Sequence, residues 1–152
     1  MSAYFFDSSA LAKLYHNETG SAWIRETVRE SGHRILISRL TVVEIQSVFA
    51  VKVRSDAISL EEAATLRRGF LSDIRDGAFE VLALALHHYR RAEQLIESYG
   101  FRHRLRTLDA LQLSVATELP KACWTTSWLR TNRCAKWQCR KAFPLSIRRL
   151  HR

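Results

Sequence analysis

The stretch Ala3-Tyr4-Phe5-Phe6-Asp7-Ser8-Ser9-Ala10 decides how this chain is expected to fold. An apolar run that stops at a carboxylate and is followed by hydroxyl residues and a helical pattern is typical of a buried strand. Such a strand delivers its acid to the C-terminal edge of the sheet, which is where ligands bind in open α/β folds. We therefore expect Asp7 to lie at a functional site.

Short β-type runs alternate with helical patterns along the rest of the chain. Further strands are predicted at residues 34–38, 79–83 and 122–127, and helices at 8–15, 19–31, 41–53, 59–77, 86–99 and 107–119. Strands separated by helices predict a parallel sheet that is covered on both faces. The predicted fold class is therefore α/β, a three-layer α/β/α domain with a central parallel sheet.

The composition indicates one domain core and an atypical end. With 152 residues, 47% of them hydrophobic, the chain is long enough to bury about 70% of its unfolded surface. Residues 1–118 carry 15 basic and 15 acidic side chains, whereas residues 119–152 carry nine basic residues and no acid, which accounts for the net charge of +9. We expect residues 1–119 to form the domain core. Residues 120–152 form an atypical basic segment in which 122–127 is the candidate last strand.

Cysteine usage and hydropathy favour a cytoplasmic protein. The three cysteines, Cys123, Cys134 and Cys139, are odd in number and clustered late, so no disulfide framework is expected. Their separations also differ from a paired zinc knuckle. No apolar run approaches the ~18 residues of a membrane-spanning helix, and the N-terminus lacks the pattern of a signal peptide. We therefore expect no membrane association.

Three acids stand at comparable places, and each has an ordinary structural explanation. Asp7 could cap the first helix. Glu44 could be the reciprocal partner in a capping box that begins at Thr41. Asp109, which Thr107 precedes as the predicted cap, could simply complement a helix dipole.

Their arrangement in the predicted sheet favours a shared role instead. Helices that start at one edge of a parallel sheet bring all three acids toward one place. Two carboxylates 4 Å apart repel by roughly 4 kcal/mol at an effective dielectric constant of 20. A hard cation such as Mg²⁺ or Mn²⁺, which prefers carboxylate, water and phosphate oxygens, removes that penalty. Such a metal polarises a phosphate and activates water for attack on a phosphodiester.

The motifs around these acids resemble the PIN domain family. The likeness rests on hydrophobic-Asp-Ser-Ser at the N-terminus, Thr41-Val42-Val43-Glu44-Ile45, and the later Leu-Asp-Ala-Leu-Gln-Leu; it covers residues 2–119 in order and spacing. Within the family it is nearest to the VapC-type toxins of bacterial and archaeal toxin–antitoxin pairs. The resemblance implies a Mg²⁺- or Mn²⁺-dependent endoribonuclease, usually a homodimer, that cleaves RNA and is inhibited by a cognate antitoxin protein. It implies metal ligation by Asp7, Glu44 and Asp109, with Ser8 as a nearby polar group.

The chain departs from the family pattern where a fourth acid is expected. Family members usually carry it in a setting like Thr-Ser-Asp, whereas here Thr126-Ser127 is followed by Trp128, and no acid follows Glu118. We therefore expect weakened activity, and the alternative is a catalytically inactive PIN-like protein that binds antitoxin or RNA without cleaving. A frameshifted C-terminus would explain the change in composition near Pro120, and the coding DNA would test that hypothesis.

Each of the remaining sequence features allows a functional and an ordinary structural interpretation. Arg102, Arg104 and Arg106 could contact the RNA backbone or could form a plain solvated loop. His87-His88 is predicted to lie on a solvated helix face. The Arg- and Trp-rich tail could bind RNA, although a fortuitously basic tail explains it as well. A phosphatase that uses Asp7 as nucleophile would need a second acid at the position of Ser9.

Overall fold

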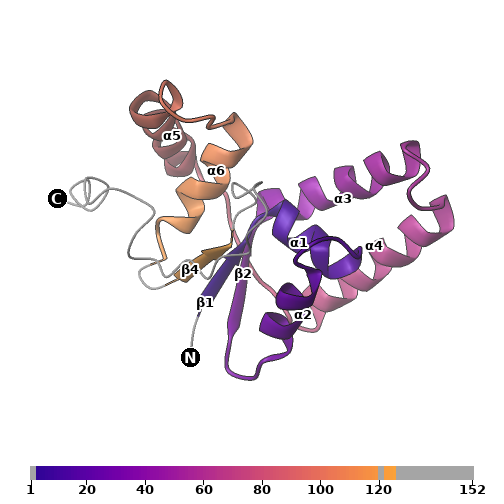
Figure 1. The fold of residues 1–152 in the computed structure, drawn as a ribbon. Coiled ribbons are helices and arrows are strands. Elements are labelled where there is room, and N and C mark those ends of the chain that lie inside the picture. Colours follow the sequence, from indigo (N-terminus) through magenta and orange to yellow (C-terminus); the bar gives the residue numbers. More distant parts are fainter. Residues whose placement is uncertain (1–2, 120–121, 126–152) are drawn as a thin grey trace.

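The computed structural model describes residues 3–119 and the strand at 122–125. In chain order the elements are β1 (Ala3–Phe6), α1 (Ser8–Tyr15), α2 (Ser21–Arg29), β2 (Arg34–Ser38), α3 (Arg39–Arg54), α4 (Leu60–Arg75), β3 (Glu80–Leu82), α5 (Leu86–Leu95), a π-helical turn η1 (Ile96–Gly100), α6 (Thr107–Ala116) and β4 (Ala122–Thr125) (Figure 1). The four predicted strands are all present. Cys134, Cys139 and Trp128 lie outside the described residues.

The strands of the described residues form one parallel sheet in the order β3-β2-β1-β4. Side chains alternate between its faces, as the geometry of a strand requires. Phe6 and Ile37 pack with helices α1 to α4, whereas Phe5 and Leu36 pack with Val115 near the end of α6. Figure 1 shows the two groups of helices on opposite sides of the sheet. The predicted three-layer α/β/α architecture is therefore confirmed.

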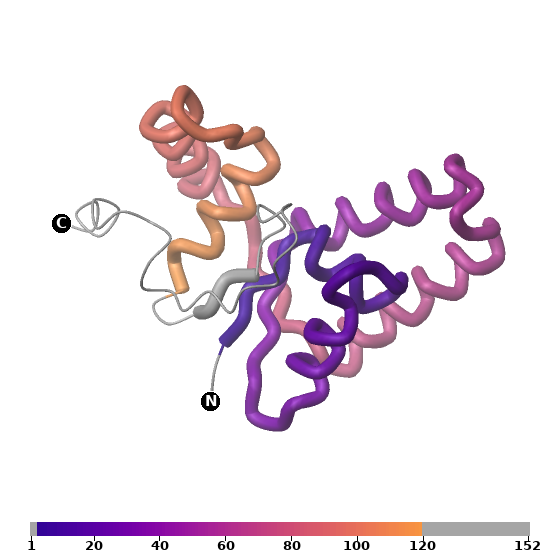
Figure 2. The backbone as a smooth tube through the Cα atoms, in the orientation of Figure 1, coloured from indigo at the N-terminus to yellow at the C-terminus, as the bar shows by residue number. Residues whose placement is uncertain are grey.

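Helices α3 and α4 form an antiparallel hairpin that extends away from the sheet (Figure 2). The predicted capping box at the start of α4 is present, because Ser59 Oγ accepts from the backbone N–H of Glu62 at 3.0 Å and Glu62 Oε2 accepts from the N–H of Ser59 at 2.6 Å.

The capping box predicted at Thr41 is wrong. Helix α3 begins two residues earlier, and its cap is Ser38, whose Oγ accepts from the backbone N–H of Thr41 at 3.1 Å. Ser38 is both the last residue of β2 and the cap, so the strand leads directly into the helix. As a result, Glu44 lies in the second turn of α3 and has no capping role.

Two further predictions about helix ends need correction. The helix predicted at 86–99 is α-helical only to Leu95 and continues as the π-helical turn η1. The cap of α6 is Arg106, and Thr107 is already the first helical residue. Within the described residues, no helix has the length and apolar character needed to cross a membrane.

Candidate metal centre

The C-terminal ends of β1 and β2 bring two polar residues to one edge of the sheet. Phe6 pairs with Ile37 in the parallel register, so Asp7 and Ser38 follow at neighbouring positions. Helices α1 and α3 start from these two residues. The edge therefore has the geometry predicted for a ligand site.

Asp7 is buried at this edge, with 6% of its surface exposed. It is the N-cap of α1, and its Oδ1 accepts from the backbone N–H of Ala10 at 2.8 Å. The prediction that Asp7 caps the first helix is thus confirmed, because its carboxylate stabilises the start of α1. Its position also places a negative charge at the sheet edge.

Asp109 is the third residue of α6, and its Oδ2 accepts from the backbone N–H of Arg106 at 3.3 Å. A carboxylate in the first turn of a helix also interacts favourably with the helix dipole. As for Asp7, a helix-end role accounts for part of its placement.

Glu44 differs from the other two acids because no helix end explains it. Its half-buried side chain projects from the second turn of α3, and its Oε2 accepts from Nε2 of Gln112 at 2.6 Å. That bond joins α3 to α6 across the site. Glu44 is therefore the acid whose position needs a functional explanation.

Gln112 is a site residue that sequence reasoning missed. It is 4% exposed, and its Oε1 accepts from Ser38 Oγ at 2.6 Å while its Nε2 donates to Thr41 Oγ1 at 2.8 Å. The amide thus holds the start of α3 and the carboxylate of Glu44 in one buried network. A signal was available, since Gln112 lies one helical turn after Asp109 among Ala, Leu and Val residues.

The electrostatic surroundings of Glu44 include both of the other acids. The pKa of Glu44 is raised above its ordinary value, first because burial disfavours the charged form. Hydrogen bonds from Gln112 and Ser8 oppose that shift, and the negative charges of Asp7 and Asp109 add to it. Among the described residues, the group whose ligand atoms all lie within 4.8 Å of one another is His87, His88 and Glu118, and not these three acids. Metal ligation by residues 7, 44 and 109 together therefore stays a prediction.

The donor set fits a hard divalent cation. Carboxylate oxygens are the ligands that Mg²⁺ and Mn²⁺ prefer. A cation beside Glu44 would offset both the burial of its charge and the repulsion from Asp7 and Asp109. The residues that would hold such an ion are these three acids.

The other predicted site residues lie at the start of α1 and on the loop before α6. Ser8 is the first residue of α1, and its hydroxyl interacts with Glu44. Arg102, Arg104 and Arg106 are exposed on the loop between η1 and α6. Arg106 adjoins the centre through its backbone bond to Asp109.

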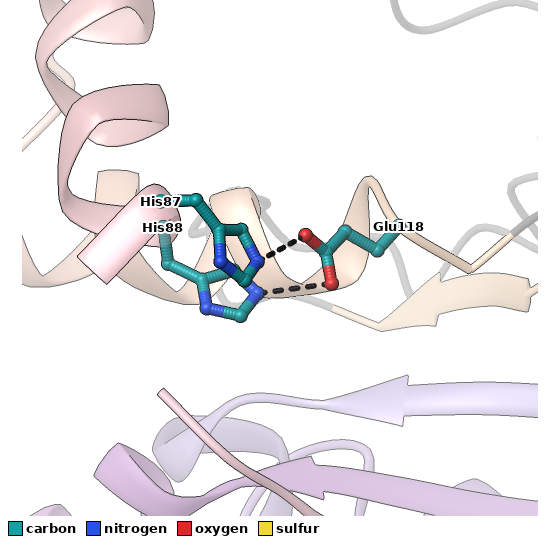
Figure 3. A group of neighbouring side chains, drawn as sticks. All are labelled: His87, His88 and Glu118. Carbon is teal, nitrogen blue, oxygen red and sulfur yellow. Dashed lines mark ion pairs between the residues drawn. The ribbon is translucent and has the colours of Figure 1, made fainter. Parts of the chain in front are cut away.

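A second cluster of ionisable groups lies at the other end of α6 (Figure 3). His87 Nε2 is 2.6 Å from one oxygen of Glu118, and His88 Nε2 is 3.1 Å from the other without the alignment of a good hydrogen bond. The prediction that both histidines are solvated is wrong for His88, whose side chain is 4% exposed because α5 packs against α6.

The tautomer of His88 argues against a metal at this second cluster. Nδ1 of His88 accepts from the backbone N–H of Ala85 at 2.9 Å, so the proton of the neutral ring must be on Nε2. A histidine that binds metal through Nε2 normally donates from its other nitrogen. His88 is instead set to donate toward Glu118, which makes the cluster a link between α5 and α6.

Comparison with known proteins agrees with the fold and with the motifs. The family model described as PIN domain matches residues 4–119. The crystal structure of VapC20 from Mycobacterium tuberculosis, described as a sarcin-ricin loop cleaving toxin, superposes with a TM-score of 0.57 at 14% identity, over 77% of this chain and 82% of that one. No curated protein sequence matches the chain. Since the family model spans most of the chain and its range includes all three acids, the chain belongs to the PIN domain family.

Proposed function

We propose that this protein is a metal-dependent endoribonuclease, the VapC-type toxin of a toxin–antitoxin pair, which hydrolyses RNA phosphodiesters in the cytoplasm. The observation that carries the proposal is the placement of Glu44, which has no helix-end role and whose pKa is raised by burial and by the negative charges of Asp7 and Asp109. A fold gains no stability from that arrangement, whereas a nuclease that binds Mg²⁺ or Mn²⁺ requires it. The similarity in fold to the toxin VapC20 supports the same reading.

Each residue of the site has a distinct task under this proposal. Asp7, Glu44 and Asp109 hold the cation, and Gln112 fixes the carboxylate of Glu44 through its 2.6 Å hydrogen bond. When bound, the metal polarises the phosphate and lowers the pKa of a water molecule. The Ser8 hydroxyl supports the charged form of Glu44.

The basic loop before α6 supplies positive charge for the substrate. Arg102, Arg104 and Arg106 are exposed and lead directly to Asp109. Phosphate contacts of this kind position an RNA without reading its sequence.

We also propose two protein partners. A cognate antitoxin would cover the acidic centre with a segment that carries arginine. A second copy of the chain would pack on α3, whose outer face exposes Val43 and Val51, two turns apart. Exposed apolar residues on one helix face are typical of a dimer interface.

A catalytically inactive protein is the second candidate. Its support is the sequence after Glu118, which contains no acid and has Trp128 where the family pattern carries its fourth carboxylate. Such a protein would bind antitoxin or RNA without cleaving it.

RNA cleavage with and without Mg²⁺, measured on the wild type and on Asp7→Asn, separates the two candidates. Asparagine is as good an N-cap as aspartate, so the substitution removes the charge and keeps the start of α1. We expect Mg²⁺-dependent cleavage by the wild type and its loss in Asp7→Asn. Equal cleavage by both would rule out the proposed mechanism. If the wild type is inactive, cleavage gained by Trp128→Asp would identify a damaged site.

A further inference from the structure

Phe101 is the most exposed large apolar side chain of the described residues, with 92% of its surface open to solvent. It lies between the end of η1 and the basic loop that leads to α6. An aromatic ring in water gains nothing for the fold, because burial is what makes aromatic residues stabilising. The exposure of the Phe101 ring therefore indicates a functional role.

The loop that carries Phe101 is held in place by its backbone. The N–H groups of Arg102 and His103 both donate to the carbonyl of Tyr99, at 3.1 and 2.8 Å, and Leu105 N–H donates to the carbonyl of His103 at 2.7 Å. Leu105 also packs against the cluster formed by α5 and α6. The exposure of the ring is thus a property of a fixed turn.

The turn η1, which comes directly before Phe101, has an unusual conformation. η1 is a π-helix, a rare form that is frequently found at functional sites. A side chain at Gly100 would meet Cγ2 of Ile96 at 3.2 Å, so the close approach favours glycine here. Together they turn the chain out of α5 immediately before the exposed ring.

The surroundings of Phe101 are strongly basic. Arg102, His103, Arg104 and Arg106 are all exposed, and residues 98–108 contain no acid. At about 3.5 Å per residue, the five residues from Phe101 to Arg106 span at most about 18 Å. The ring is therefore a short distance along the chain from Asp109.

We propose that residues 101–106 form a platform for single-stranded RNA, in which an unpaired base stacks on Phe101 and the arginines contact the adjacent phosphates. The proposal rests on the nuclease function above and adds a binding site, the ring of Phe101, that would hold one base of the substrate. Stacking on an aromatic ring beside positive charge is how proteins bind single strands with little sequence preference. A base inside a duplex does not offer its face to the ring. A protein partner is the less favoured occupant because the loop carries only positive charge.

Fluorescence anisotropy with a labelled single-stranded RNA and its duplex tests the platform, using the full chain in EDTA so that binding is measured without cleavage. We expect Phe101→Ala to raise the Kd for the single strand about tenfold or more and to leave the melting temperature unchanged. Phe101→Trp should keep the affinity, whereas Phe101→Leu should lose it because leucine has no π face. Leu60→Ala, which alters another exposed apolar residue, is the matched control and should bind as the wild type does.

The arginines are tested by the salt dependence of the same binding. Replacing Arg102 and Arg104 with alanine should reduce the slope of log K against log salt by about 0.7 for each phosphate that the variant no longer neutralises. Arg29→Ala, an exposed arginine on α2, should leave the slope unchanged.

Several results would overturn the platform. These are an unchanged Kd in Phe101→Ala, full affinity in Phe101→Leu, an equal loss for the duplex, or no binding of single strands by the wild type. Cleavage in Mg²⁺ is scored separately. Weaker binding by Phe101→Ala in a chain that never cleaves RNA would uphold the platform and reject the nuclease, whereas Mg²⁺-dependent cleavage with an unchanged Kd would do the reverse.

Discussion

At the N-terminal end of α6, the charge of Asp109 acts together with that of Asp7 to raise the pKa of Glu44, whereas just beyond the C-terminal end Glu118 faces two histidines. The two residues are nine positions apart in sequence, and Glu118 lies two residues beyond Ala116, the last residue of α6. The helix dipole favours the negative charge of Asp109 and disfavours that of Glu118. The Nε2 atoms of His87 and His88 lie 2.6 and 3.1 Å from the two oxygens of Glu118.

The two ends of α6 differ in how their ionisable groups are arranged. At Glu118, one carboxylate faces the ring nitrogens of two histidines on α5. At Asp109, like charges gather, and Glu44 has its pKa raised by burial and by its neighbours. Ionisable groups whose pKa is shifted by burial and by neighbouring like charges are typical of functional sites. The acidic end is therefore where a cation would belong.

The largest expected effect is on catalysis, and the two ends of α6 provide a matched pair of variants. Asp109→Asn removes a charge from the metal centre and keeps an oxygen that can accept from Arg106 N–H. We expect Mg²⁺-dependent RNA cleavage to fall by about 100-fold or more, since loss of a ligand should exceed the 10–100-fold cost of losing a supporting residue.

Glu118→Gln is the control for that variant. It removes a charge of the same kind at the histidine cluster, just beyond the C-terminal end of α6, so the cleavage rate should stay within a factor of about two. Similar losses in both variants would show that α6 is merely destabilised and would remove the distinction between its ends.

The second effect concerns the residue that positions Glu44. Gln112→Leu removes the amide that holds Glu44 Oε2 and leaves the hydroxyls of Ser38 and Thr41 without it. We expect cleavage to fall about 10–100-fold, as for other residues that orient a metal ligand, and unfolding free energy to fall by about 1–3 kcal/mol.

A Mn²⁺ titration distinguishes positioning from simple support of the fold. If Gln112 orients Glu44, the folded variant should bind Mn²⁺ more weakly than the wild type. Unchanged Mn²⁺ affinity with reduced stability would assign Gln112 a structural role only.

Much of this arrangement could be predicted because it depends on local pattern. The apolar run before Asp7 and the spacing of the helices are enough to predict the parallel sheet and the position of Asp7 at its C-terminal edge, whereas metal ligation by Asp7, Glu44 and Asp109 stays a prediction. The start of α3 was misplaced because Ser38 and Thr41 are both good caps, and only the end of the strand decides between them. That error made Glu44 look like a capping residue.

Three features of the structure could not be predicted from local sequence patterns. Whether His88 faces water or protein depends on how α5 lies against α6, which no local pattern encodes. The π-helical turn at Ile96–Gly100 was also missed, because its residues continue the helical periodicity of α5. Gln112 was overlooked because its partners, Ser38 and Thr41, are about 70 residues away in sequence.

A smaller effect is expected at the histidine cluster. His88→Leu leaves the backbone N–H of Ala85 without its acceptor and should lower the unfolding free energy by about 1–2 kcal/mol. His87→Leu, on the exposed neighbour, should cost less. Thermal unfolding with and without Zn²⁺ then tests whether the proton on His88 Nε2 excludes a metal from this cluster. A Zn²⁺-induced rise in melting temperature that His88→Leu abolishes would mean that the cluster binds metal.

The smallest effect is a gain in stability at the acidic end. The pKa of Glu44 is raised in the folded protein, so the unfolded chain ionises first as pH rises above the ordinary value of 4.5. Folding is therefore penalised at neutral pH, and the penalty disappears below that value, where the carboxyl is protonated in both states. Glu44→Gln keeps an acceptor for Gln112 and should stabilise the metal-free protein at pH 7 by up to about 1 kcal/mol, because water screens a half-buried charge.

Urea unfolding in EDTA at pH 7 and at pH 4 measures this gain. The extra stability of Glu44→Gln over the wild type should be present at pH 7 and small at pH 4. Adding Mg²⁺ at pH 7 should make the wild type the more stable of the two, because the ion stabilises only the wild type. A Glu44→Gln variant that is less stable than the wild type in EDTA would mean that the fold uses this carboxylate as structural support. The contrast between the two ends of α6 would then disappear, since both would hold acids that stabilise the protein without a metal.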